Sequence, residues 1–162
     1  MDRRFDGKVA IVTGAATGIG QATAARLAAD GATVAVNHRP DQDPAGTLAR
    51  ISAADGRGFA VPADVRDPGQ VTAMVHGVAE RAGRLDYVVS NAAVNPFLKW
   101  DETSVEDFDL LFETNVRGTW VVCTEAAKQM IREGHGGAIV LENRNEGGLR
   151  ARMNLPRLAG AT

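Results

Sequence analysis

A glycine-rich turn between an apolar run and a helical pattern constrains the fold of this chain more than any other feature. The run from Lys8 to Thr13 is β-branched and shows no alternation of polar and apolar residues, as expected for a strand covered on both faces. After the turn, Ile19, Thr23 and Leu27 recur at helical spacing. The first unit is therefore predicted to be a strand, a turn and a helix.

Three glycines lie within this turn, and each suits a different requirement. We expect Gly14 to permit a tight exit from the strand, Gly18 to let the backbone approach a phosphate, and Gly20 to let the helix pack closely on the sheet. The N–H groups and the dipole at a helix N-terminus favour an anion. The turn, which also contains Thr17 and Ile19, is therefore predicted to hold a pyrophosphate.

The alternation of strand and helix continues along the chain to residue 141. Further strands are expected at residues 33–37, 58–62, 85–90 and 138–141, with helical patterns between them. Strict alternation requires right-handed crossovers and a parallel sheet. We predict an α/β fold, a Rossmann-like doubly wound parallel sheet of about five strands in the order 3-2-1-4-5, with ligands at the carboxyl ends of the strands.

The segment after residue 141 has a different composition. It contains four arginines and no Val, Ile, Ser, Tyr or Lys. A chain of 162 residues matches a single domain in size. We therefore predict a Rossmann-like domain over residues 1–141 and an irregular polar tail over residues 142–162. The sheet is expected to be incomplete at the edge of its fifth strand, unless the tail covers that edge.

Composition excludes several classes of function. The chain is 44% hydrophobic and 23% charged, as is ordinary for a globular domain, and its formal net charge is −2, so its overall field does not attract nucleic acid or an anionic membrane. No apolar stretch approaches the roughly 20 residues needed to span a bilayer, and no signal peptide is evident, so a cytoplasmic location is expected. The three histidines and one cysteine show no metal-ligand spacing, so no metal site is predicted.

A long helix is predicted to open with a capping box from Thr103 to Glu106 and to end near Gly134. Its inner, apolar stripe is expected to contain Phe108, Phe112, Asn115, Thr119, Cys123, Ala126 and Met130. A buried amide such as that of Asn115 needs hydrogen-bond partners. Asn115 is therefore either part of a structural network or faces a polar site.

The glycine turn, together with four later segments, resembles the short-chain dehydrogenase/reductase family. Residues 13–20 are similar to the fingerprint T-G-x-x-x-G-x-G that the family has after its first strand, and the resemblance extends from about Phe5 to Leu141. The other matching segments are Ala63-Asp64-Val65, Ser90-Asn91-Ala92-Ala93, Thr114-Asn115-Val116 and Gly137 to Leu141. Ser90 and Ala93 depart from the family's pattern.

The resemblance implies roles for these residues. It implies that residues 1–141 bind NAD(P), that Asp64 and Val65 contact the adenine ring, and that Asn91 and Ala92 border the cofactor. It also implies that Asn115 is the active-site asparagine, which helps to hold a water for proton relay. The substrate in the intact form would be a small-molecule alcohol or ketone, and a homo-oligomer is compatible with the family.

The end of the second strand bears on which dinucleotide binds. An acidic residue there would accept a hydrogen bond from the ribose 2′-hydroxyl of NAD, whereas an arginine would bind the 2′-phosphate of NADP. This chain has Asn37, His38 and Arg39, and no acid among them. Arg39 favours NADP over NAD, although it is also compatible with a solvated loop.

The catalytic residues of the family are missing. Its serine segment is replaced by Leu141-Glu142-Asn143-Arg144, and its Tyr-x-x-x-Lys positions would fall near Leu158 and Thr162. The sequence is therefore interpreted as a truncated or frameshifted dehydrogenase without activity. The alternatives are a non-catalytic nucleotide-binding or regulatory module and a methyltransferase, although the latter usually has an acid after the second strand.

Overall fold

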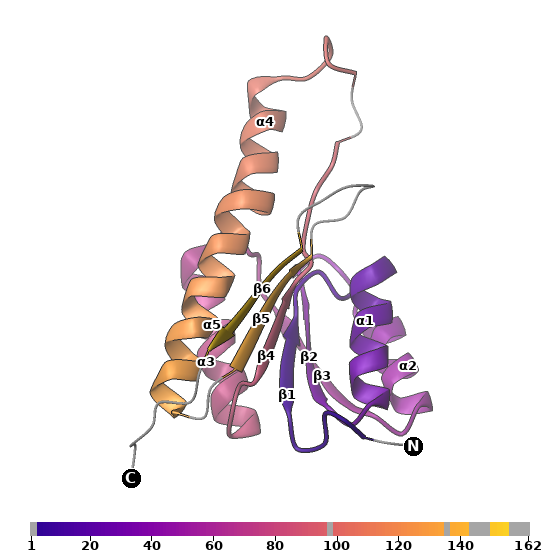
Figure 1. The fold of residues 1–162 in the computed structure, drawn as a ribbon. Coiled ribbons are helices and arrows are strands. Elements are labelled where there is room, and N and C mark those ends of the chain that lie inside the picture. The colour runs from indigo at the N-terminus through magenta and orange to yellow at the C-terminus, as the bar shows by residue number, and fades with distance from the viewer. Residues whose placement is uncertain (1–2, 97–98, 135–136, 143–149, 156–162) are drawn as a thin grey trace.

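The computed structural model describes residues 3–96, 99–134, 137–142 and 150–155, which form a single sheet flanked by helices (Figure 1). The strand order is β3-β2-β1-β4-β5-β6. All neighbouring strands are parallel except β5 and β6, which are antiparallel. The predicted five parallel strands in the order 3-2-1-4-5 are confirmed. The strands are β1 (Val9–Val12), β2 (Thr33–His38), β3 (Arg57–Pro62), β4 (Tyr87–Ser90), β5 (Gly137–Glu142) and β6 (Arg150–Leu155).

Helices cover both faces of the sheet. On one face lie α1 (Gly18–Ala29) and α2 (Ala45–Ala53), and on the other lie α3 (Pro68–Ala82) and α5 (Thr119–Glu133) (Figure 1). The central strand β1 contributes to both layers, because Ile11 packs with α3 and α5 while Val12 packs with α1 and α2. Both side chains are fully buried, which explains why β1 lacks polar alternation.

The predicted irregular tail contains a strand. β6 runs antiparallel to β5, with Gly137 opposite Leu155 and Glu142 opposite Arg150. An uncovered edge strand presents free N–H and C=O groups, and an antiparallel neighbour can satisfy them without a crossover helix. The edge of β5 that was expected to be incomplete is therefore paired. Residues 143–149 and 156–162 of the predicted tail lie outside the described residues.

The long helix is built from three segments that continue into one another: α4 (Val105–Leu111), the π-helical η1 (Phe112–Gly118) and α5. The predicted capping box is displaced by one residue: the Asp107 N–H donates to Ser104 Oγ at 3.1 Å and the Ser104 N–H donates to Asp107 Oδ2 at 3.0 Å. Figure 1 shows the α4 end extending well beyond the sheet.

The predicted apolar stripe is buried only over the sheet. Ala126 and Met130 are fully buried, whereas Phe108 and Phe112 are exposed and stack on each other with ring centroids 4.3 Å apart. The placement of these two rings in the core was wrong because no described element of the chain packs over that end of the helix. None of the helices in the described part of the chain is long and apolar enough to span a bilayer.

Candidate nucleotide-binding site

A pocket of about 240 Å³ lies at the carboxyl ends of β1 to β4. The fold rule for doubly wound sheets places ligands at this edge. Most of the residues predicted to bind a cofactor line it, namely Gly14, Thr17, Arg39, Asp64, Val65, Asn91 and Ala92. Gly18, Ile19 and Gly20 form the adjoining first turn of α1. The structure thus brings together segments that are up to about 80 residues apart in sequence.

The glycines of the turn after β1 differ in what surrounds them. Gly14 has φ of +61°, and a Cβ added there would lie 2.8 Å from Ala92 Cα. A Cβ on Gly20 would lie 2.3 Å from the carbonyl oxygen of Gly14, so the start of α1 packs directly on the turn. Gly18 has φ of +57° and open space where a Cβ would project. Gly14 and Gly20 are therefore required for packing, whereas Gly18 leaves its side clear for an approaching group.

The N-terminus of α1 is suited to an anion. Thr17 is its N-cap residue, but the Thr17 side chain makes no capping hydrogen bond. The N–H groups in the first turn of a helix have no partners within the helix. Since Thr17 lines the pocket, these N–H groups and the helix dipole can stabilise a phosphate there.

Thr13 and Asn91 join the ends of β1 and β4 by hydrogen bonds. Thr13 Oγ1 accepts from the backbone N–H groups of Asn91 and Ala92, each at 3.0 Å. The Asn91 amide Nδ2 donates to the carbonyls of Thr13 at 3.0 Å and Gly14 at 3.2 Å. The Asn91 side chain thus fixes the first residues of the glycine turn through their carbonyl groups.

Asn37 has a similar positioning role that the sequence analysis missed. Its side chain is 1% exposed, and its Oδ1 accepts from the Gly14 N–H at 3.4 Å. Its Nδ2 donates to the carbonyls of Val61 at 3.2 Å and Ala63 at 3.0 Å. An amide at the end of an otherwise apolar buried strand was the available signal, because such a group needs partners.

Asn115 lies in the π-helical segment and ties it to the loop after β4. Its Oδ1 accepts from the Val94 N–H and its Nδ2 donates to the Val94 carbonyl, both at 2.9 Å. Both ends of the amide are therefore bonded to main chain. π-Helical turns occur frequently at functional sites, where they change the direction of a side chain. The catalytic role expected for Asn115 stays a prediction.

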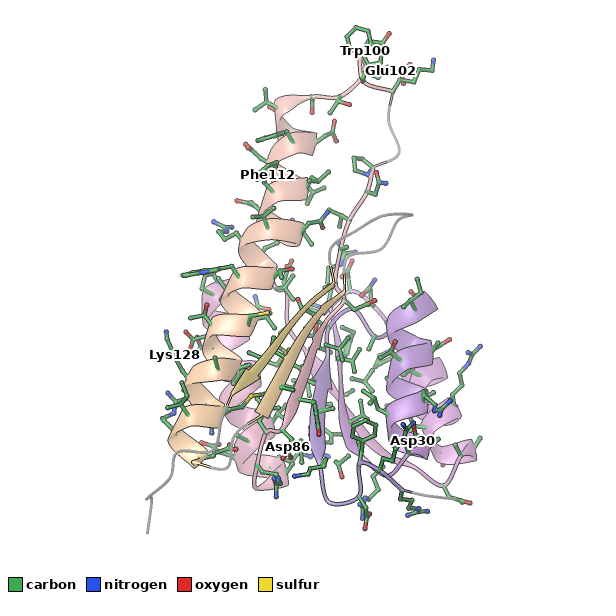
Figure 2. All side chains as sticks on the ribbon, viewed as in Figure 1. Asp30, Asp86, Trp100, Glu102, Phe112 and Lys128 are labelled. Atoms are coloured by element: carbon green, nitrogen blue, oxygen red, sulfur yellow. The ribbon has the colours of Figure 1, made fainter. Side chains whose placement is uncertain are left out.

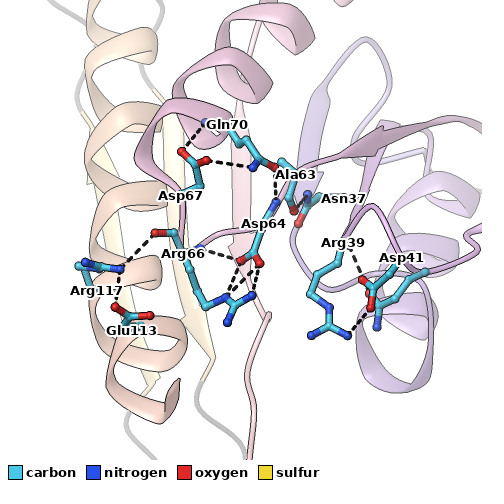
Figure 3. Close-up of polar contacts among 11 residues, drawn as sticks. Asn37, Arg39, Asp41, Ala63, Asp64, Arg66, Asp67, Gln70, Glu113 and Arg117 are labelled. Carbon is cyan, nitrogen blue, oxygen red and sulfur yellow. Dashed lines mark hydrogen bonds and ion pairs between the residues drawn. The ribbon is translucent and has the colours of Figure 1, made fainter. Parts of the chain in front are cut away.

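Charged side chains occupy the outer end of the pocket (Figure 3). Arg66, which the sequence analysis did not single out, donates to both carboxylate oxygens of Asp64, with Nη2 to Oδ2 at 2.6 Å. The hydrogen bond from Arg66 is the largest influence on the Asp64 carboxyl, and it lowers the pKa despite partial burial. Arg39 pairs with Asp41 at 2.9 Å between Nη2 and Oδ2. Both arginines at this end are therefore matched by a carboxylate.

The chain's single tyrosine is far from this chemistry. Tyr87 is the first residue of β4, at the opposite end of that strand from the pocket, and its ring packs edge-on against Phe5. Among the described residues, no group of three or more His, Cys, Asp or Glu side chains is arranged to hold a metal ion.

Comparison with known proteins agrees with this arrangement. The model of the short chain dehydrogenase family matches residues 8–148. An L-rhamnose 1-dehydrogenase (NAD(P)(+)) from Sphingomonas sp. strain SKA58 is 40% identical over 137 residues, covering 84% of this chain and 54% of that protein. The chain thus spans about half the length of the curated relatives it matches.

Two solved structures have the same fold and carry dinucleotides. A short chain dehydrogenase from Mycobacterium paratuberculosis bound to NAD has a TM-score of 0.77 and 35% identity, covering 85% of this chain and 56% of that one. One from Burkholderia cenocepacia J2315 in complex with NADP has a TM-score of 0.73 and 40% identity, covering 78% of this chain and 52% of that one. The chain belongs to the short-chain dehydrogenase/reductase family, a family of oxidoreductases that bind NAD(P).

Proposed function

We propose that this chain binds NADP(H) in preference to NAD(H) at the carboxyl edge of the sheet. The observation that carries the proposal is that one pocket is lined by Gly14 and Thr17 of the glycine turn, by Arg39 and by the Asp64-Val65 pair. The N-terminus of α1 and the turn from Gly14 to Gly20 would hold the pyrophosphate. Asp64 and Val65 would border the adenine, and Arg39 would bind the 2′-phosphate.

Relatives are found with NAD and with NADP, so they support binding of a dinucleotide by this chain. The choice between NAD and NADP must be argued from the residues of the pocket. The name of the Sphingomonas relative includes both cofactors, and the two solved structures contain NAD and NADP respectively. Asn37, His38 and Arg39 at the end of β2 include no carboxylate to accept a hydrogen bond from a 2′-hydroxyl, and the Arg39 guanidinium lies on the pocket wall. The preference for NADP therefore rests on Arg39.

We further propose that these 162 residues bind cofactor without turnover. The dinucleotide supplies hydride transfer to or from a small alcohol or ketone, and the developing oxyanion needs a proton donor beside it. Asn91 and Asn115 shape the site through bonds to main chain, but an amide does not donate a proton at neutral pH. Tyr87 lies at the wrong end of its strand, and residues 142–162 contain no Ser, Tyr or Lys.

This chain would then act as a non-catalytic nucleotide-binding module, and its match to the short chain dehydrogenase family argues against the methyltransferase alternative. An alcohol or ketone would be the substrate of the intact dehydrogenase, and not of these 162 residues. A homo-oligomer and a cytoplasmic location stay predictions from the sequence.

A titration tests the binding step. We expect NADPH to bind more tightly than NADH, and Arg39→Asp to reverse that order because the new carboxylate repels a phosphate and accepts a hydroxyl. Arg50→Asp is the control, since it makes the same change of charge on an exposed position of α2 outside the pocket. Equal dissociation constants for the two cofactors in the unmodified chain would remove Arg39 from this role.

A separate assay tests the absence of turnover. NADPH absorbance is followed with a panel of ketones and aldehydes, and we expect a rate indistinguishable from buffer. General acid–base catalysis alone contributes about 10²- to 10⁴-fold, and none of the residues that the structure describes at the pocket supplies the Tyr and Lys that would provide it. Turnover that disappears in an Asn115→Ala variant would overturn the proposal and would show that the site around Asn115 is catalytic in this chain.

A further inference from the structure

The Arg39 guanidinium, at the outer end of the pocket, already has a carboxylate partner. Arg39 lines the pocket, whereas Asp41 approaches the guanidinium from outside the pocket lining, with Nη2 and Oδ2 2.9 Å apart. Among the described residues, Asp41 is the one side chain paired with this guanidinium. In Figure 3, Asp41 and the Asp64–Arg66 pair lie on opposite sides of Arg39.

We propose that Asp41 is a specificity-determining residue that weakens the preference for a 2′-phosphorylated adenosine by competing with the phosphate for Arg39. The inference rests on the proposed cofactor site and names a residue that limits its selectivity.

The charges at this end of the pocket support the proposal. Arg39 and Arg66 are positive, Asp41 and Asp64 are negative, and together they cancel. Arg66 is held by Asp64 through both carboxylate oxygens, so it is not free to compensate. A phosphate monoester brings about −1.5 to −2 charges at neutral pH. An incoming 2′-phosphate therefore meets no net positive charge and must share or displace the Asp41 carboxylate. A 2′-hydroxyl carries no charge, is not repelled by Asp41, and can donate a hydrogen bond equally to this carboxylate or to the amide oxygen of an Asn in its place.

The exposure of the pair limits the size of the effect. The Arg39 and Asp41 side chains are 45% and 67% exposed, so water screens their attraction. Exposed pairs of this kind are weak, and neutralising Asp41 is expected to strengthen binding of a 2′-phosphate by about two- to five-fold. Because Asp41 is on the surface, Asp41→Asn does not threaten the fold.

The test compares two nucleotides that differ at the 2′ position, 2′,5′-ADP and 5′-AMP. Their dissociation constants are measured by calorimetry for the unmodified chain, Asp41→Asn, Arg39→Gln and the double variant. The control is Asp43→Asn, which removes the same charge two residues farther along, where the Asp43 carboxylate accepts from the Ala45 N–H at 2.9 Å and an Asn can do the same.

We expect Asp41→Asn to lower the dissociation constant of 2′,5′-ADP by about two- to five-fold and to leave that of 5′-AMP unchanged. In the Arg39→Gln background, Asp41→Asn should have no effect on either constant. An equal gain in Asp43→Asn, an equal gain for 5′-AMP, or a gain that persists without Arg39 would each overturn the inference. In those cases the nucleotides still bind and the proposed function stands. If neither nucleotide binds the unmodified chain, the proposed function fails and the inference fails with it.

Discussion

The carboxyl ends of the strands and the projecting helical segment are built in opposite ways. At the strand ends, polar side chains such as Thr13 and Asn37 are buried and bonded to main chain from distant parts of the sequence. Along α4 and η1, large apolar side chains such as Phe108 and Phe112 are exposed, and α4 has no buried residue. In these two regions polarity does not indicate burial, and position relative to the sheet decides which side chains are buried.

The largest expected loss of stability is at Asp86, which lies at the amino ends of β1 and β4, opposite the pocket. Its carboxylate is buried and accepts hydrogen bonds from the Val9 N–H at 2.9 Å, from Lys8 Nζ at 3.2 Å and from Arg84. Asp86→Ala leaves these groups without an acceptor and should lower the free energy of unfolding by about 3 kcal/mol. Asp101→Ala, in the exposed segment before α4, is the control and should change it by less than about 0.5 kcal/mol. Urea denaturation measures both, and similar losses in the two variants would contradict the contrast.

The same carboxylate should make stability depend on pH. Burial by itself raises the pKa of Asp86, but the hydrogen bonds from Arg84, Val9 and Lys8 outweigh it, so the pKa is lowered in the folded protein. The unfolded chain then binds the proton more readily, and the contribution of Asp86 is complete above about pH 4 and is lost as the pH falls through the folded value. Unfolding measured from pH 6 to pH 2 should show a smaller loss in Asp86→Ala than in the unmodified chain. Parallel curves for the two proteins would exclude this linkage.

A smaller effect, on binding, is expected at Gly18. Its φ of +57° is unfavourable for residues with a Cβ, and the space beside it is open to the proposed pyrophosphate. Gly18→Val should therefore weaken NADPH and NADH together by about ten-fold, since a branched side chain would stand where the phosphates approach. Gly77→Val is the control, because Gly77 also has open space beside it but lies in α3 outside the pocket. Undiminished affinity in a folded Gly18→Val variant would remove the turn from the cofactor site.

The smallest effect is expected at the start of α5, directly after the projecting segment, and a large effect there would contradict the comparison. Trp120 is 67% exposed, so Trp120→Gln should change the free energy of unfolding by less than about 0.5 kcal/mol. Val122 lies two residues farther along α5 but is fully buried, and Val122→Ala should cost about 2 kcal/mol. A loss in Trp120→Gln as large as that in Val122→Ala would mean that the Trp120 face is covered in solution.

The sequence predicts the parts of this molecule that depend on local pattern. Strand order and the glycine turn follow from alternating segments and from residues adjacent in sequence, and the structure confirms the parallel order of the first five strands. The π-helical turn at Asn115 shifts the phase of the helix, and no periodicity in the sequence indicates it. The Asp64–Arg66 bond and the pairing of β6 with β5 depend on side-chain and edge geometry that exist only after folding.

The bonds between Thr13 and Asn91 also bear on how the protein assembles. The two residues are 78 positions apart, and β1 pairs with β4 only after β2, β3 and the helices between them have been made. Contacts of such long range slow folding, because a large loop must close before they form. During synthesis, the glycine turn leaves the ribosome early but reaches its final geometry only once β4 has emerged. The proposed nucleotide site is therefore complete only after β1 and β4 have paired, so a bound nucleotide would stabilise the finished sheet and would not guide its early assembly.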